Sequence, residues 1–404
     1  MSAYIIDDSN AERLRIRPDR LAHLDHRLQE WIDKDERQAF VVRIMRKGEE
    51  IFSGAWGHSF MPDKKEPMQL DHIFPVMSTT KAVTATLAMQ LMEDGELDVY
   101  DSVGKYCEEF NTEKTKDIEL WHFATHTSGL TDFNHDDAVR EYLFGELGLQ
   151  EPSEGVKAPL GEISWRRALP QAREKLELEP IDDPVQADED TYRHIAKMLH
   201  IKPLWAPRQK TFYCNIGYDY LKIILEKVSG KSIDILAQER LFGPLGMKDT
   251  HYRLPKNKYG RVIQRAEGAR CYPWLNTVEQ YENGGGGIKS TAGDMMRFSE
   301  MIRRGGSLDG AHILSPVTVK AMMKNHNVEP ELEDWAFGFN YRAMKHDAHS
   351  IIFPATAVEY GGLGGVMNVI DAENELSIAM FTIEIEDKPK LFSPMENMIY
   401  SALY

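Results

Sequence analysis

Apolar positions along the chain follow two different periods, which predict where helices and strands lie. After Pro18 a helix with one apolar face is predicted, because five apolar residues recur at helical spacing: Leu21, Leu24, Leu28, Trp31 and Ile32. Residues 39–46 and 50–57 predict a strand hairpin turned at Lys47-Gly48-Glu49. Residues 356–361, 366–370 and 376–385 predict three further antiparallel strands, followed by a helix that contains Met395, Met398, Ile399 and Leu403.

The stretch from Pro75 to Gly95 is rich in helix-forming residues and poor in charge, so it predicts a mostly buried helix. Ser78 falls in its first turn, and Lys81 lies one turn later on the same face. A partly neutral, desolvated amine beside a hydroxyl is a base beside a nucleophile. The spacing alone is not specific, because Ser102 and Lys105 share it, and Ser78 could instead be a helix N-cap.

Between these ends the pattern is mainly helical. A helix is predicted over residues 216–229 with Gly230 as its cap, and Thr291 is predicted to cap another. The glycine run 284–287 lacks the phosphate-loop pattern and predicts a tight backbone passage near the pocket, while residues 145–190 predict irregular surface structure. The expected fold class is α+β: an antiparallel sheet built from both termini and flanked by helices.

This fold predicts two lobes with the active site between them. Residues 1–100 and 284–404 would form the sheet lobe, and residues 101–283 a mostly helical inserted lobe.

Composition narrows the class of protein. The 404 residues carry a net charge of -16 without a basic cluster, which argues against nucleic-acid and membrane partners. Three widely spaced cysteines and an N-terminus without signal-peptide features predict a cytoplasmic protein without a disulfide framework. His58, His72 and His251 lack metal-binding spacing, so neither a metal nor another cofactor is expected; the oligomeric state is left open.

Six motifs occur in an order that resembles the serine β-lactamase and penicillin-binding-protein superfamily. The similarity extends from about Phe40 onward and is greatest to the branch of class C β-lactamases, DD-peptidases and family VIII carboxylesterases. The motifs are Ser78-Thr79-Thr80-Lys81, His126-Thr127-Ser128-Gly129-Leu130, Tyr213-Cys214-Asn215, Pro244-Leu245-Gly246-Met247, the glycines before Ser290-Thr291-Ala292-Gly293-Asp294, and Tyr360-Gly361-Gly362-Leu363-Gly364-Gly365.

The resemblance implies a role for each motif. Ser78 would be the nucleophile, with Lys81 and Tyr213 as the acid/base pair. Backbone N–H groups of Ser78 and Leu363 would form the oxyanion hole, and Asn215 would point its amide at the substrate or at Lys81, or simply cap its helix. A second Tyr-x-Asn, which begins at Tyr281, runs into glycines and is the weaker match.

The third motif departs from the family pattern. Tyr360, Gly361 and Gly362 are expected to line the substrate site, but position 360 lacks the cation that the family usually carries. That loss weakens recognition of a substrate carboxylate and favours an ester substrate. His126 belongs to a loop that is structural in this family, and without a Gly-x-Ser-x-Gly elbow a Ser-His-Asp triad is disfavoured.

The predicted function is therefore a serine hydrolase that cleaves small carboxylic esters through an acyl-enzyme on Ser78. A β-lactamase, a D-amino-acid-specific peptidase or amidase, and an acyltransferase are the alternatives with the same fold. A non-catalytic binding relative is a further alternative, but it would be expected to lose Ser78, Lys81 or Tyr213, and the chain keeps all three.

Overall fold

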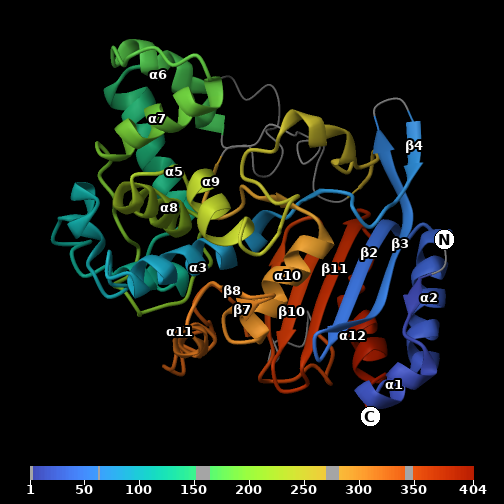
Figure 1. Ribbon diagram of the computed structural model, residues 1–404. Coiled ribbons are helices and arrows are strands. Elements are labelled where there is room, and N and C mark those ends of the chain that lie inside the picture. Colours follow the sequence, from blue (N-terminus) through green and yellow to red (C-terminus); the bar gives the residue numbers. More distant parts are fainter. Residues whose placement is uncertain (1–2, 62–63, 152–163, 270–281, 342–348) are drawn as a thin grey trace.

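One antiparallel sheet takes its strands from both ends of the chain. The structure is a computed structural model, and it describes residues 3–61, 64–151, 164–269, 282–341 and 349–404. Within these residues seven strands pair in the order β1-β3-β2-β11-β10-β9, with β4 paired to β3 (Figure 1). They are β1 (Tyr4–Ile5), β2 (Arg37–Arg46), β3 (Glu49–Met61), β4 (Lys64–Pro67), β9 (Val358–Gly362), β10 (Val366–Asp371) and β11 (Leu376–Glu384). This confirms the predicted α+β class.

The centre of the sheet joins the first and last parts of the chain. Strands β2 and β3 form the predicted hairpin, whose turn residues Lys47 and Gly48 have φ of 51° and 82°. Strand β11 pairs with the other edge of β2, and Ile378 lies opposite Ile44. The outer edge of β2 in the N-terminal hairpin therefore depends on the C-terminal strand β11 for its hydrogen-bond partners.

Successive strand residues point to opposite faces of the sheet, and helices cover both faces. Phe40 and Val42 share a core with α2 (Pro18–Asp33) and α12 (Phe392–Tyr400). Val41 and Phe381 share the other core with α3 (Thr80–Glu93) and α10 (Ala292–Arg303), and Figure 1 shows α2 and α12 on one side of the sheet and α10 on the other.

Helices form the other part of the molecule, at the upper left of Figure 1. The predicted helix over residues 216–229 is confirmed as α8, capped by Gly230 at φ 68°. The α-helices of this part are α4 (Leu120–Ala124), α5 (Asp132–Arg140), α6 (Leu169–Lys175), α7 (Pro184–Ala196), α8 (Ile216–Ser229) and α9 (Ile233–Ala237). Among the described helices, none combines the length and apolar character that spanning a bilayer requires.

The prediction of irregular surface structure over residues 145–190 is wrong for most of its described part. The 3₁₀-helix η5 (Ser164–Ala168) and helix α6 are ordered elements, and α7 begins within the same range. Trp165 is 1% exposed and stacks on Tyr192, with ring centroids 5.4 Å apart. The abundance of Glu, Pro and Asp concealed a short amphipathic pattern; residues 152–163 lie outside the described range.

A buried ionic cluster joins the terminal helix α12 to strand β9. His349 places Nδ1 2.6 Å from Glu396 on α12 and Nε2 3.1 Å from Glu359 on β9. Burial opposes a charge on the imidazole, but contacts with Glu359 and Glu396 outweigh it and raise the pKa of His349 to about 9. The protonated ring therefore holds two buried carboxylates together.

Replacing the buried indole tests whether η5 and α6 belong to the core. Trp165→Ala is expected to lower the free energy of unfolding by about 3–5 kcal/mol, because it removes a fully enclosed ring. Trp205→Ala, at a partly exposed position, is the matched control. Denaturant unfolding measures both, and equal small losses would contradict a core role for Trp165.

The His349 cluster predicts a pH-dependent stability. A pKa raised in the folded state stabilises the fold fully below the ordinary histidine pKa of about 6.5, and this contribution is lost as pH rises through about 9. His349→Gln should therefore lower Tm most below pH about 6.5, with a smaller difference above pH about 9. His23→Gln, on the exposed face of α2, is the control; a difference independent of pH would contradict the prediction.

Candidate active site

Ser78 lies just before α3, whereas the sequence predicted it inside the first turn of that helix. It sits in the 3₁₀-helix η1 (Met77–Thr79), and α3 itself starts at Thr80. Met77 has φ of 47°, a left-handed backbone conformation that residues other than glycine rarely adopt. Ser78 is thus presented on a strained turn at the N-terminal end of a buried helix, where backbone N–H groups favour negative charge.

Lys81 is buried and makes hydrogen bonds to three parts of the chain. Its Nζ donates to Ser78 Oγ at 3.2 Å, to Asn215 Oδ1 at 2.7 Å and to the carbonyl of Gly285 at 2.8 Å. The side chain belongs to a residue only 4% exposed. Three acceptors match the three donors of an ammonium group, which is the condition for burying such a cation.

Tyr213 completes the group around the serine. Its hydroxyl donates to Ser78 Oγ at 2.6 Å, and its ring centroid lies 4.8 Å from Lys81 Nζ. The residue is 41% exposed, so this side of Ser78 faces solvent. The predicted trio of Ser78, Lys81 and Tyr213 is therefore brought together, although it comes from two separate segments.

His126 supports the segment that carries Tyr213. Its Nδ1 accepts the Cys214 N–H at 3.2 Å, and its ring lies 4.6 Å from that of Tyr213. Burial and the charge of Lys81 hold the pKa of His126 well below its usual range. A neutral, buried imidazole in this place positions Tyr213, in agreement with the structural role expected for its motif.

Asp132 is a residue of this site that the sequence reasoning missed. Its Oδ1 accepts the backbone N–H groups of Asn215 at 2.7 Å and Ile216 at 3.0 Å, and its Oδ2 accepts Asn215 Nδ2 at 2.8 Å. Cys214, buried as expected, also donates its thiol to Asp132, and burial raises the pKa of that thiol well above its usual range. An aspartate at a helix start is common, so only the fold reveals its partner.

The glycine run passes tightly beside Lys81, as predicted. A Cβ at Gly284 would lie 2.1 Å from the Tyr218 carbonyl, and a Cβ at Gly285 would lie 3.2 Å from Lys81 Nζ. Thr84 donates to the Gly284 carbonyl at 2.7 Å, which fixes the passage on α3. Small residues are needed here so that backbone carbonyls can reach buried donors.

The third motif differs from the prediction at Tyr360. The residue is 4% exposed, and its hydroxyl hydrogen-bonds to Ser299 on α10 at 2.6 Å. The side chain lies in the core and does not line a substrate surface. Gly362 approaches the turn before Ser78 so closely that a Cβ would lie 2.0 Å from the Val76 carbonyl, while Leu363 beyond it is 48% exposed.

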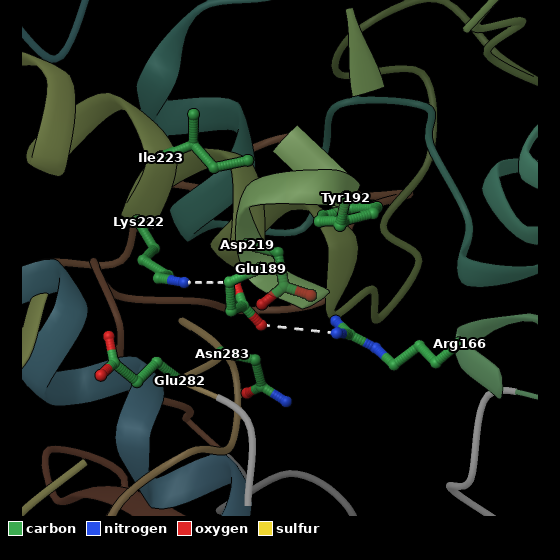
Figure 2. A pocket seen from close by; sticks show the side chains of 8 residues that line it. All are labelled: Arg166, Glu189, Tyr192, Asp219, Lys222, Ile223, Glu282 and Asn283. Atoms are coloured by element: carbon green, nitrogen blue, oxygen red, sulfur yellow. Dashed lines mark hydrogen bonds and ion pairs between the residues drawn. The ribbon is translucent and has the colours of Figure 1, made fainter. Parts of the chain in front are cut away.

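A network of buried charges lies next to Asn283, the residue before the glycine run (Figure 2). Asp219 on α8 accepts the Gly284 N–H at 2.9 Å, and burial raises the pKa of its carboxyl group against the opposing effects of Arg166 and Lys222. Lys222 binds Glu189 at 2.8 Å, and Arg166 lies 3.4 Å from the same carboxylate. These contacts link α7, α8 and η5 to the glycine run, whose Gly285 carbonyl accepts a hydrogen bond from Lys81.

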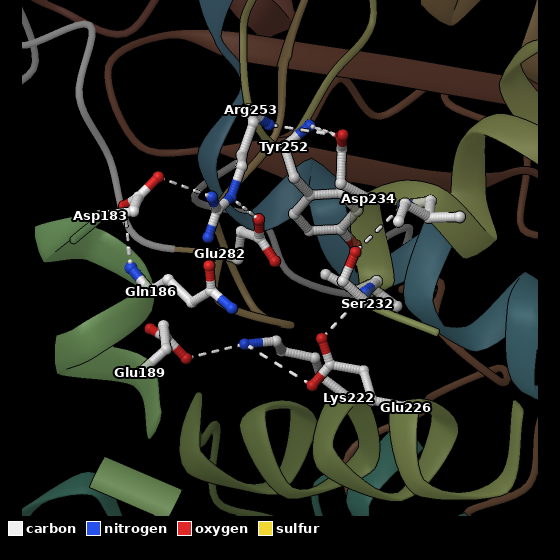
Figure 3. A network of polar contacts seen from close by, with 12 residues as sticks. Asp183, Gln186, Glu189, Lys222, Glu226, Ser232, Asp234, Tyr252, Arg253 and Glu282 are labelled. Carbon is white, nitrogen blue, oxygen red and sulfur yellow. Dashed lines mark hydrogen bonds and ion pairs between the residues drawn. The ribbon is translucent and has the colours of Figure 1, made fainter. Parts of the chain in front are cut away.

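Figure 3 shows the same Lys222 between two carboxylates. Its Nζ lies 2.8 Å from Glu189 on α7 and 3.9 Å from Glu226 one turn along α8. Glu226 also accepts the backbone N–H of Ile233 at 2.8 Å, at the start of α9. One buried ammonium group thus joins α7, α8 and α9.

The fold and the Ser78-x-x-Lys81 site between sheet and helices define the class of serine β-lactamases and penicillin-binding proteins. The sequence profile of the family described as Beta-lactamase matches residues 24–384, and the chain belongs to that family.

Similar proteins carry different activities in their names. D-alanyl-D-alanine-carboxypeptidase/endopeptidase AmpH of Escherichia coli (strain K12) is 25% identical over 82% of this chain and 75% of its own. EstCE1, a hydrolase with promiscuous acyltransferase activity, is 18% identical, has a TM-score of 0.67 and covers 97% of this chain and 100% of its own. A penicillin-binding protein homologue from Caulobacter crescentus is 19% identical, has a TM-score of 0.69 and covers 96% and 99%.

Removing the buried cation of the network should destabilise the helical part. Lys222→Met leaves Glu189 and Glu226 without their shared ammonium partner, and we expect a loss of about 3 kcal/mol in the free energy of unfolding. Lys227→Met, at an exposed position of the same helix, is the control. Thermal and denaturant unfolding measure both, and equal stability of the two variants would contradict a supporting role for the network.

Proposed function

We propose that the protein is a serine hydrolase that cleaves small carboxylic esters through an acyl-enzyme on Ser78. The observation that carries the proposal is the contact of Ser78 Oγ with both Tyr213 Oη at 2.6 Å and Lys81 Nζ at 3.2 Å. A hydroxyl between an amine and a phenol has a route for losing its proton and a route for delivering one.

The environment of Lys81 supports its role as the base. When the amine is neutral, its two N–H groups match the two fixed acceptors, Asn215 Oδ1 and the Gly285 carbonyl. Its lone pair is then free to face Ser78 Oγ and accept the hydroxyl proton as the oxygen attacks the ester carbonyl. The backbone N–H groups of Ser78 and Leu363 are our proposed donors to the resulting oxyanion.

Tyr213 is the proposed route to the leaving group. As the tetrahedral intermediate collapses, the bond to the alcohol oxygen breaks and Tyr213 supplies the proton that this oxygen takes up, while Lys81 replaces the proton on the phenol. Water then enters, loses a proton to the same pair and attacks the acyl carbonyl, releasing the acid and restoring Ser78. The partial exposure of Tyr213 fits this exchange of protons with solvent.

The third motif favours an ester over a substrate with a carboxylate to bind. Tyr360 is buried and its hydroxyl is engaged with Ser299, and Gly361 and Gly362 carry no side chain. The motif therefore offers no cation or hydroxyl for the carboxylate of a β-lactam or of a peptide C-terminus. An ester needs only an acyl pocket and oxyanion donors.

A peptidase, amidase or β-lactamase activity is the second candidate, favoured by the likeness to AmpH over 82% of this chain. Acyl transfer is a variant of either reaction, in which an alcohol or amine replaces water as the acceptor. We propose a small ester or amide as the substrate class and the cytoplasm as the compartment.

Intact-mass spectrometry tests the proposal with three probes: a fluorophosphonate, p-nitrophenyl butyrate and a penicillin. We expect the fluorophosphonate to add once to wild type and not to Ser78→Ala, with ester turnover reduced by about 10³-fold or more in that variant. Ser102→Ala is the matched control, because Ser102 shares the Ser-x-x-Lys spacing but donates its hydroxyl to the Lys116 carbonyl.

The outcomes separate the candidates. Rapid ester turnover with little penicillin adduct supports the esterase, whereas a lasting or turned-over penicillin adduct on Ser78 favours the second candidate. Absence of labelling of wild type by all three probes would overturn the catalytic assignment.

A further inference from the structure

The carboxylate of Asp132 lies where α5 and α8 begin side by side. It is the first residue of α5, and a capping box between Thr131 and Asn134 fixes that helix start. The first residues of α8 have no cap of their own, because the Asn215 side chain makes no capping hydrogen bond. Asp132 Oδ1 takes this place by accepting the N–H groups of Asn215 and Ile216 at 2.7 and 3.0 Å.

The second carboxylate oxygen decides how the Asn215 amide is oriented. Asp132 Oδ2 lies 2.8 Å from Asn215 Nδ2, and an ionised carboxylate can only accept hydrogen bonds. The NH₂ group must therefore face Asp132, which leaves Oδ1 facing Lys81 Nζ at 2.7 Å. The reverse orientation would oppose two acceptors at Asp132 and two donors at Lys81.

We propose that Asp132 is a positioning residue that locks the Asn215 amide with its oxygen toward Lys81. The inference rests on the proposed function, because the consequence concerns the base. Without that oxygen Lys81 keeps the Gly285 carbonyl and Ser78 Oγ as acceptors among the described residues, and the amine can rotate away from the serine. Asp132 thus acts on Ser78 through two side chains and never touches it.

The same carboxylate also sets the position of Tyr213. Cys214, which follows Tyr213, donates its thiol to Asp132 Oδ1 at 3.4 Å and its N–H to His126 at 3.2 Å. The backbone on the C-terminal side of the phenol is therefore held from two directions. Position of the tyrosine and orientation of the asparagine depend on one residue.

A single-atom change separates orientation from helix capping. In Asp132→Asn the amide oxygen can still accept the backbone N–H groups, but its NH₂ now opposes the NH₂ of Asn215. The Asn215 amide is expected to turn over and withdraw its oxygen from Lys81, so the rate of fluorophosphonate labelling of Ser78 should fall by about 10-fold or more. Asp137→Asn, an exposed position on the same helix with the same loss of charge, should label like wild type.

Exchanging the two groups provides a readout that a purely structural role would not move. Asn215→Asp alone places two carboxylates against each other and should label slowly. The double variant Asp132→Asn with Asn215→Asp restores a donor facing an acceptor, and it should label at least about 5-fold faster than either single variant.

Each result decides between the claims. The positioning role is overturned if Asp132→Asn labels at the wild-type rate, or if the double variant labels no faster than the single variants. Either result leaves the proposed function intact. If wild type does not label, the proposed function fails and the exchange is judged by Tm instead. A Tm of the double variant above both single variants then supports the orientation, and a Tm below both overturns it.

Discussion

A buried lysine ammonium group imposes the strictest requirement on this structure. Lys81 is 4% exposed, and an ammonium removed from water is tolerated only when acceptors replace the lost hydration. Its acceptors come from the turn before α3, from the start of α8 and from the glycine run. These three segments must therefore meet at one point, and the surrounding fold is arranged so that they do.

Close backbone approach is the means by which they meet. Gly284 and Gly362 stand where a Cβ would lie about 2 Å from a neighbouring carbonyl, so both positions bring main chain against main chain. Asp219 holds the glycine run in place by accepting the Gly284 N–H. These close main-chain contacts hold the glycine run beside Lys81 and the third motif beside the turn of Ser78.

The family to which the chain belongs includes proteins named for different reactions, so the fold alone does not specify a substrate. Tyr360 is an informative position in this chain, because it is buried against α10 and its hydroxyl is engaged with Ser299. Asp132 is informative in another way, because it acts on the amide beside Lys81 rather than on the substrate.

The sequence by itself determined the elements whose periodic pattern is strong and the motifs whose residue types are demanding. The hairpin, the C-terminal strands and helix α8 could be predicted because local spacing and turn residues specify them. Ser78 and Lys81 were candidates from their spacing, and the resemblance to a known family supported them and added Tyr213. Tertiary structure alone decided that residues 164–175 form helical elements that bury Trp165, that Tyr360 turns inward, and that Asp132 reaches α8. Those outcomes depend on which segments, distant in sequence, pack against each other, and no local pattern encodes the partner of a buried side chain.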